Sequence, residues 1–221
     1  MKHKKIYVVI PGFNEESRIG RVVELVKRHC ENIIVIDDGS QDNTANISKN
    51  AGASKVIRIP VNVGKGKALR HGCDIAIENK ADIIIIIDAD LQHDPSDATR
   101  LLSALEGNDI VFTYRDFRGS MPLIFRFGNW FISKTAQILF NIDVKDTQCG
   151  YRCFTSEAYK KIRWNSERYF MDTEIVALAG MNKLKFTQIK IKTIYSDRRK
   201  GTNVGDGIKI VKNMFKWKLQ K

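Results

Sequence analysis

Residues 83–92 read IIIIIDADLQ, five isoleucines followed directly by two aspartates one residue apart. A continuous β-branched run is typical of a strand buried on both faces, and such strands belong to parallel sheets. Ligands of open α/β sheets bind just beyond the carboxyl ends of the strands, where Asp88 and Asp90 would lie. Residues i and i+2 of an extended chain share a face, so both carboxylates can reach one divalent cation, with Gln92 as a third oxygen ligand. A polar turn at the end of a strand explains a lone Asp-x-Asp equally well.

Around this run, short β-type segments alternate with helical segments through the first half of the chain. Strands are expected near residues 6–10, 33–36, 55–59, 82–87 and 109–113. Helices are expected over residues 16–29, 42–50, 66–79 and 95–106. Such βαβ repetition predicts an α/β fold with a mostly parallel, doubly wound sheet.

Length and composition narrow the class of protein. A chain of 221 residues is long enough for one domain with a substantial core. The N-terminus does not match a secretory signal, and the apolar runs fall short of the roughly 20 residues that span a bilayer. The four cysteines form neither a disulfide framework nor a zinc pattern, which fits a reducing cytosol. We therefore expect a cytoplasmic, soluble or peripheral protein without a transmembrane segment.

Positive charge is concentrated at the C-terminal end. Residues 181–221 hold twelve lysines and arginines against two aspartates, and so carry most of the net charge of +12. A basic end of this kind suits nucleic acid, an anionic membrane or phosphorylated substrates. No nucleic-acid-binding motif accompanies it, so a nucleic-acid partner is disfavoured.

Two amphipathic helices are expected in the second half of the chain. Residues 123–140 are rich in aromatic residues, with a polar set that recurs at three- and four-residue steps. Residues 208–219 place lysines on one face and apolar side chains, including Phe215 and Trp217, on the other. A basic amphipathic helix with aromatic residues is typical of an anionic membrane surface. A helix that packs on the core with a solvated lysine face remains the alternative.

Three further segments place polar groups or glycines at strand ends and helix starts. They read PGFNEES (residues 11–17), VIDDGSQDNT (35–44) and NVGKGK (62–67). Asp37 and Asp38 suit hydrogen-bond donors such as ribose hydroxyls or a base N–H. Glycines and lysines at a helix start suit an anion, although the pattern is neither a P-loop nor a dinucleotide fingerprint.

Taken in order with DADLQHDP (88–95), these segments resemble the family-2 glycosyltransferases over nearly the whole chain. The resemblance implies their GT-A fold, a Rossmann-like nucleotide-sugar-binding sheet. It implies a Mg²⁺ or Mn²⁺ ion held by Asp88, Asp90 and Gln92. It also implies a nucleotide-sugar-binding set: Pro11, Phe13, Glu15, Asp37, Asp38, Lys65, Lys67, Asp88, Ala89 and Asp90.

The second half resembles one branch of that family, the polyprenyl-phosphate hexosyltransferases such as dolichyl-phosphate glucose and mannose synthases. The resemblance rests on DTQCGYR (146–152), FMDTE (170–174) and DRRKGT (197–202). Asn203 stands where serine is commoner, and the transmembrane helices of many relatives are missing. The resemblance implies inverting transfer of a hexose from a UDP- or GDP-sugar to a polyprenyl or dolichyl phosphate at the cytoplasmic face of a membrane.

A phosphate acceptor needs positioning more than it needs a base, because its oxygens are already anionic near neutral pH. Guanidinium groups suit that task. We expect Arg115, Arg126 and Arg198 to hold the acceptor phosphate with Asn129 and Ser133, and Asp90, Arg115 and Arg198 to be catalytic. We expect Asp172 and Glu174 to contribute to the electrostatics of the active site or to the structure of the acceptor loop, and not to remove a proton.

The expected organisation is a single catalytic domain over residues 1–221. Residues 1–115 would bind the nucleotide sugar, and residues 116–221 would bind the acceptor and carry interfacial helices. The main alternative is a soluble family-2 transferase with a hydroxyl acceptor, in which Asp172 or Glu174 serves as the base. A catalytically inactive relative that only binds nucleotide sugar is a further alternative. The sequence does not determine which sugar and which nucleoside diphosphate the donor carries, or the oligomeric state of the protein.

Overall fold

The computed structural model describes residues 4–115, 123–192 and 204–219. Its strands are β1 (Ile6–Gly12), β2 (Asn32–Asp37), β3 (Lys55–Arg58), β4 (Ile83–Ile86), β5 (Ile110–Arg115), β6 (Arg152–Thr155) and β7 (Phe186–Ile191). Its helices are α1 (Ile19–Lys27), α2 (Thr44–Asn50), α3 (Lys65–Glu78), α4 (Ala98–Ala104), α5 (Leu123–Phe140), α6 (Ser156–Ile162), α7 (Met171–Met181) and α8 (Val204–Leu219). A short 3₁₀ turn, Pro95–Asp97, precedes α4.

The strands form one seven-stranded sheet in the order β3-β2-β1-β4-β6-β5-β7. Only β6 pairs antiparallel with its neighbours, β4 and β5. The prediction of a mostly parallel, doubly wound α/β sheet is confirmed. The isoleucine run forms the central strand β4, and Ile83 to Ile87 are each at most 1% exposed.

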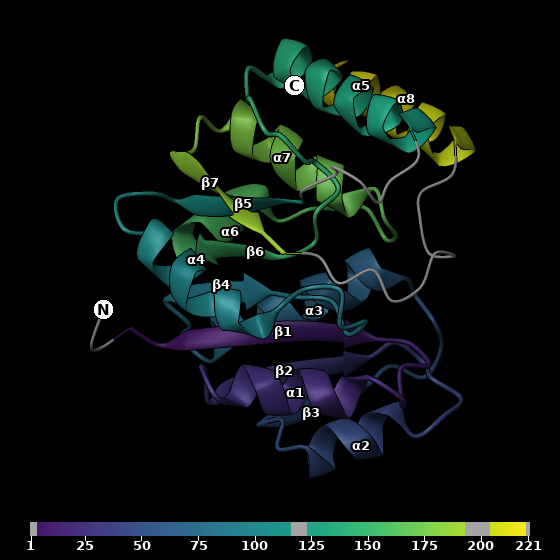
Figure 1. Cartoon of the computed structure of the whole chain (residues 1–221), viewed down its shortest axis with the longest axis vertical. Coiled ribbons are helices and arrows are strands. Elements are labelled where there is room, and N and C mark those ends of the chain that lie inside the picture. Colours follow the sequence, from purple (N-terminus) through teal and green to yellow (C-terminus); the bar gives the residue numbers. More distant parts are fainter. Residues whose placement is uncertain (1–3, 116–122, 193–203, 220–221) are drawn as a thin grey trace.

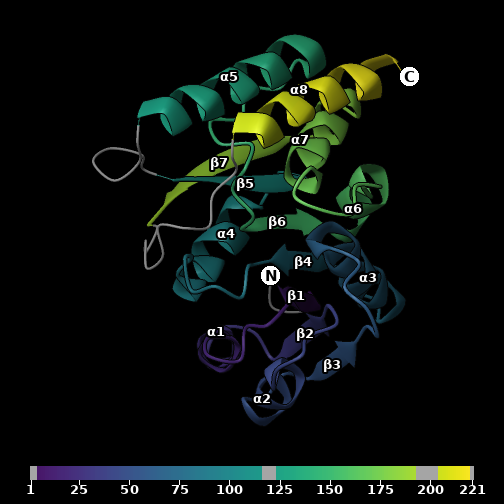
Figure 2. The same cartoon turned by 90° about the vertical axis from the view of Figure 1, so that its right-hand side faces the viewer.

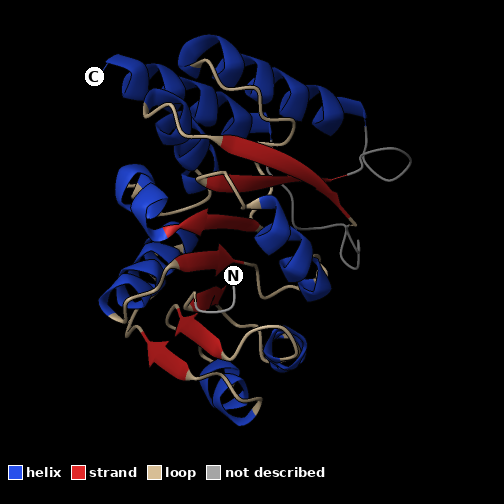
Figure 3. Cartoon of the chain, turned by 90° about the vertical axis from the view of Figure 1, so that its left-hand side faces the viewer, coloured by secondary structure: helices blue, strands red, loops and turns tan. Residues whose placement is uncertain are grey.

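Helices cover both faces of the sheet (Figures 1 and 3). Alternate residues of β1, β2 and β4 point to opposite faces, because side chains of a strand alternate with a period of two. One set packs with α1 and α4, and the other packs with α3, α6 and α7. Helices α5 and α8 lie side by side as an outer layer over α7 (Figure 2). This outer pair lies at the opposite end of the molecule from α1 and α2 (Figure 1).

Helix α1 begins at Ile19, three residues later than expected, and the reason is local. The backbone amides of Arg18 and Ile19 both donate to the carbonyl of Glu15, which makes a turn of the preceding residues. Pro11 and Gly12 of the PGFNEES segment therefore end β1, and residues 13–18 form the loop between this strand and α1.

The sheet brings distant segments to one edge. The carboxyl ends of β1, β2, β4 and β5 all lie there, because these strands are parallel. Antiparallel β6 starts at the same edge, since Arg152 pairs with Ile86. Residues 146–151 are thus placed beside Asp88, and β7 ends there with Ile191 opposite Arg115.

Candidate active site

Asp88 lies in a chain of alternating charges at this edge of the sheet. Lys65, the first residue of α3, places its Nζ 2.7 Å from Asp88 Oδ1 and 3.8 Å from Asp172 Oδ2. The Arg152 guanidinium lies 3.5 Å from the other oxygen of Asp172. Although burial opposes ionisation, Lys65 holds the pKa of Asp88 below its usual range. Asp88 is therefore a carboxylate at neutral pH.

Asp90 lies in a tight turn, two residues after Asp88. Its Oδ1 accepts a 3.0 Å hydrogen bond from the Gln92 amide, and Leu91 between them has a φ of 60°. A positive φ is uncommon for a residue with a side chain and marks a turn fixed by its surroundings. Burial raises the pKa of Asp90, and the charge of Asp88 raises it further. The two carboxylates are thus close enough to repel each other.

Asp88 and Asp90 suit a hard divalent cation. Carboxylate oxygens are its preferred ligands, and Mg²⁺ is usually held by one or two carboxylates together with substrate phosphates. Within residues 4–115, 123–192 and 204–219, no group of three His, Cys, Asp or Glu residues is arranged to hold a metal ion. The two aspartates fit a metal completed by a substrate diphosphate. Gln92 as a third ligand remains a prediction.

Gly150 leaves room for this cluster. A Cβ added at this position would lie 2.8 Å from Asp88 Oδ2 and 3.0 Å from Lys65 Nζ. The backbone of the DTQCGYR segment therefore packs directly against the ion pair. A side chain at position 150 would require Asp88 or Lys65 to shift.

The acids predicted to hold the nucleoside are buried at the same edge, where they bind backbone amides. Asp38 accepts hydrogen bonds from the amides of Val63 (2.8 Å) and Gly64 (2.9 Å), and burial raises its pKa. Asp37 accepts one from the Ser40 amide at 2.9 Å. Of the remaining predicted binding residues, Pro11 and Ala89 are buried and Phe13 is 45% exposed. Glu15, also buried, pairs with Arg18 at 2.9 Å. Their nucleotide contacts stay predictions.

The glycines of NVGKGK have a packing role. Gly64 has a φ of 92°, and a Cβ there would lie 2.5 Å from the Glu167 carbonyl oxygen. Gly66 likewise lies against the backbone of residues 166–168. The two lysines diverge, because Lys65 reaches Asp88 whereas Lys67 lies 3.8 Å from Glu167. The close approach thus explains the glycines without an anion.

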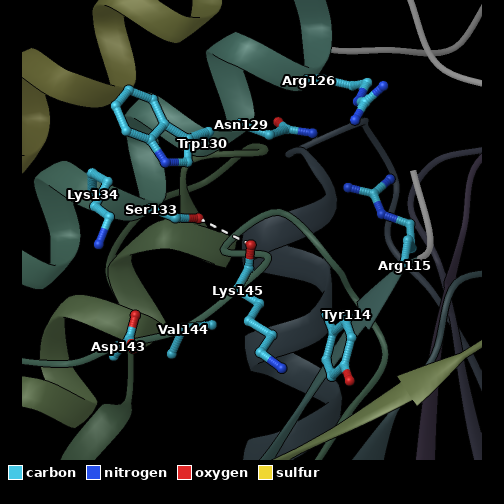
Figure 4. A pocket seen from close by; sticks show the side chains of 10 residues that line it. All are labelled: Tyr114, Arg115, Arg126, Asn129, Trp130, Ser133, Lys134, Asp143, Val144 and Lys145. Carbon is cyan, nitrogen blue, oxygen red and sulfur yellow. Dashed lines mark hydrogen bonds between the residues drawn. The ribbon is translucent and has the colours of Figure 1, made fainter. Parts of the chain in front are cut away.

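A pocket of about 470 Å³ lies at the carboxyl end of β5. Its walls come from β5, α5 and the loop after α5 (Figure 4). Arg126, Asn129 and Ser133, at steps of three and four residues, share one side of α5 and line it together with Arg115. Four of the five residues predicted to hold an acceptor phosphate therefore meet in one pocket. The fifth, Arg198, lies outside the described residues.

Arg115 is held in place by an acid that the sequence did not single out. Its Nε lies 2.7 Å and its Nη2 3.1 Å from the two oxygens of buried Asp146. Such a bidentate pair fixes the plane of the guanidinium. Asp146 belongs to DTQCGYR, but sequence spacing alone could not pair it with the end of β5.

The two acids of the FMDTE segment have different surroundings. Glu174 accepts hydrogen bonds from the amides of Asn165 and Ser166, both at 2.8 Å, and so ties down the loop before α7. Asp172 is 4% exposed and lies between Lys65 and Arg152. Burial raises its pKa despite these two cations.

Comparison with known proteins places the chain in a family. The model of "Glycosyl transferase family 2" matches residues 7–163. The chain belongs to glycosyl transferase family 2. This glycosyltransferase is 39% identical over 228 residues to an uncharacterised protein of Methanocaldococcus jannaschii, covering 98% of this chain and 92% of that protein.

A second relative carries a specific name. It is the UDP-N-acetylglucosamine–dolichyl-phosphate N-acetylglucosaminyltransferase of Methanococcus voltae, 34% identical over 249 residues, with 100% of this chain and 99% of the relative covered. Among solved structures, glucosyl-3-phosphoglycerate synthase of Mycobacterium tuberculosis, in complex with Mn²⁺, UDP and glucosyl-3-phosphoglycerate, matches with a TM-score of 0.71. That match covers 97% of this chain and 78% of the other at 19% identity, and it supports the GT-A fold alone.

Proposed function

We propose that this glycosyltransferase moves a hexose from a nucleotide sugar to a polyprenyl phosphate, with inversion and with a divalent cation. The observation that carries the proposal is the pocket in which Arg115 and Arg126 meet. Arg115 is close enough for its charge to contribute to the lowered pKa of Asp88. An acceptor phosphate in the pocket would thus lie next to the donor site. The acceptor named for the Methanococcus voltae relative, dolichyl phosphate, agrees with this.

Asp88 and Asp90 would hold the cation, with Gln92 nearby. When bound, the cation would offset the negative charge that builds up on the departing nucleoside diphosphate. The Mn²⁺ and UDP crystallised with the Mycobacterium tuberculosis synthase support a cation on this fold. In the proposed division of labour, residues 1–115 bind the donor and residues 116–221 bind the acceptor.

The protein's own residues would position the acceptor. Its phosphate oxygen is the nucleophile and is already ionised near pH 7. Arg115, oriented by Asp146, and Arg126 would direct that oxygen toward the sugar. The hydroxyl-acceptor alternative needs a base, but Glu174 is engaged by two backbone amides and Asp172 by two cations. These contacts favour the phosphate acceptor.

An apolar surface on α5 and α8 would bring the enzyme to its lipid. Phe127, Phe131 and Ile138 lie on one side of α5, and Ile208, Phe215 and Leu219 lie on one side of α8. All six are between 47% and 85% exposed. On the other side of α8, Ile210 and Met214 are buried in the core, so the helix packs and also presents an apolar face.

Charge points to an anionic membrane as the partner of this surface. Lys209, Lys212 and Lys216 are exposed on α8, and Lys134 is exposed on α5 among the apolar residues. Lysines around an aromatic patch are typical of helices that lie at an anionic interface. Among the described residues, no helix is long and apolar enough to span a bilayer. We propose peripheral attachment to the cytoplasmic face.

Replacing Phe131 and Phe215 together by glutamate is expected to weaken sedimentation with anionic vesicles at least about ten-fold, because two interfacial aromatics are lost. Both side chains are about half exposed, so the core should stay intact. The matched control is Val61→Glu, at an exposed apolar site on another part of the surface. Equal sedimentation of the double variant and the control would assign the two helices to packing alone.

A screen of donors against acceptors tests the function. UDP- and GDP-sugars would be combined with a prenyl phosphate, with Mn²⁺ or Mg²⁺, and nucleoside diphosphate release measured. Release that depends on both the prenyl phosphate and the cation is expected. Nucleoside diphosphate release that is the same with and without the prenyl phosphate would contradict the proposal.

A further inference from the structure

Lys65 already occupies the carboxylate that a cation would need. Its Nζ lies 2.7 Å from Asp88 Oδ1, a distance typical of a charge-assisted hydrogen bond. Both side chains are 21% exposed, so the pair borders solvent at the edge of the sheet. The ion pair therefore lies where a ligand can reach it.

The surroundings hold the lysine in this position. Lys65 starts α3, and the glycines on either side of it pack against residues 166–168. Asp172 attracts the ammonium from a second direction at 3.8 Å. The backbone at Gly150 closes the space next to Asp88 Oδ2 and Lys65 Nζ. The ammonium thus has a defined place between two carboxylates.

An ammonium and a divalent cation at the same carboxylate oppose each other. Like charges a few ångströms apart at a partly buried site repel each other, and solvent screens this repulsion only in part. The ammonium also uses one oxygen of Asp88 as an acceptor. A metal ion that binds Asp88 must therefore displace Lys65 or bind weakly beside it.

We propose that Lys65 is a built-in counter-ion that competes with the metal for Asp88 and keeps the metal affinity of the substrate-free enzyme low. The inference rests on the proposed metal role of Asp88 and Asp90. A donor diphosphate offers the ammonium a new anionic partner and so frees Asp88. Metal and diphosphate then bind together, which is a reciprocal coupling between two ligands. Lys65 would thus affect metal binding indirectly, by occupying Asp88.

Binding of Mn²⁺ alone, with no nucleotide or acceptor present, tests the competition. Titration calorimetry on Lys65→Gln and Lys65→Met is expected to show Mn²⁺ affinity about ten-fold higher than in the unaltered protein, within the range usual for coupled sites. Lys160→Gln is the matched control, because it also removes one lysine from an ion pair, with Glu157 on α6. The control should leave the Mn²⁺ affinity unchanged.

If Lys65 had only a structural role, replacing it would not raise the Mn²⁺ affinity. Unchanged or weaker Mn²⁺ binding in both Lys65 variants would overturn the inference. Thermal unfolding with and without Mn²⁺ gives a second reading, since tighter binding to the folded state raises the melting temperature more. Asp90→Asn separates this inference from the proposed function. If Mn²⁺ binding survives Asp90→Asn unchanged, the metal site itself is wrong; if it is lost while the Lys65 variants bind as before, only the competition is wrong.

Discussion

Replacing Asp90 by asparagine is expected to lower sugar transfer by at least about a hundred-fold, the size of loss seen when one group that stabilises developing charge is removed. The carboxylate is one of two that would hold the cation, and an amide is a much weaker ligand. Burial and the charge of Asp88 raise the pKa of Asp90, so above its ordinary pKa its ionisation costs folding stability. The variant should therefore unfold at the same temperature or higher.

Transfer assays and thermal unfolding of the same preparation check this prediction. Asp94→Asn is the matched control in the same loop. Asp94 accepts a hydrogen bond from the Ser96 amide, and an asparagine side chain can accept the same bond. The control should retain activity. Unchanged turnover of Asp90→Asn would remove the metal assignment, and a large fall in melting temperature would instead make Asp90 structural.

Replacing Arg115 by lysine is expected to lower kcat/KM for a prenyl phosphate by about a hundred-fold while nucleotide affinity stays the same. Lysine keeps the charge but loses the planar fork that Asp146 holds through Nε and Nη2. The phosphate would then be attracted but not oriented, and misplacement of a reacting atom is costly. Steady-state kinetics with the acceptor varied, and calorimetry with the nucleoside diphosphate, separate the two effects.

Arg100→Lys controls for the general effect of an arginine-to-lysine change. Arg100 also pairs with an aspartate, Asp97, but on α4 away from the pocket. It should leave both measurements unaltered. If Arg115→Lys behaves like this control, the acceptor does not use the pocket on β5 and α5.

Sequence patterns predicted the first five strands because four of them are apolar runs bounded by polar turns and β3, KVIR, holds two β-branched residues between such turns. Strand β6 was not predicted, since it starts with Arg152, a charged side chain that is fully buried. The buried guanidinium donates to the Thr147 carbonyl in the preceding loop and lies 3.5 Å from Asp172 on α7. Only the folded chain brings α7 to this position.

The candidate site was predicted in its parts but not in its contacts. The position of Asp88 and Asp90 followed from strand direction, and the acceptor set of α5 followed from the chemistry of phosphate. The pairing of Lys65 with Asp88 joins the start of α3 to the end of β4, and no local pattern reports it. The same holds for Asp146, which orients Arg115 across the sheet edge.

Helix α8 packs on the core with one side and exposes apolar side chains on the other, so it has features of both expected roles. Ile210 and Met214 pack on the core, whereas Ile208 and Phe215 are more than half exposed. Hydrophobic periodicity alone does not separate these groups, because both are apolar and lie on neighbouring turns. The exposure of the second group leaves an apolar surface for the proposed membrane contact.

The most direct measurement is a comparison of a prenyl phosphate with the corresponding prenol as acceptor for a labelled nucleotide sugar, with Mn²⁺ present. We expect label to enter the organic phase with the phosphate alone, since its oxygen is the proposed nucleophile, whereas Asp172 and Glu174 are engaged by cations and backbone amides. Transfer to the prenol at a similar rate would contradict this expectation.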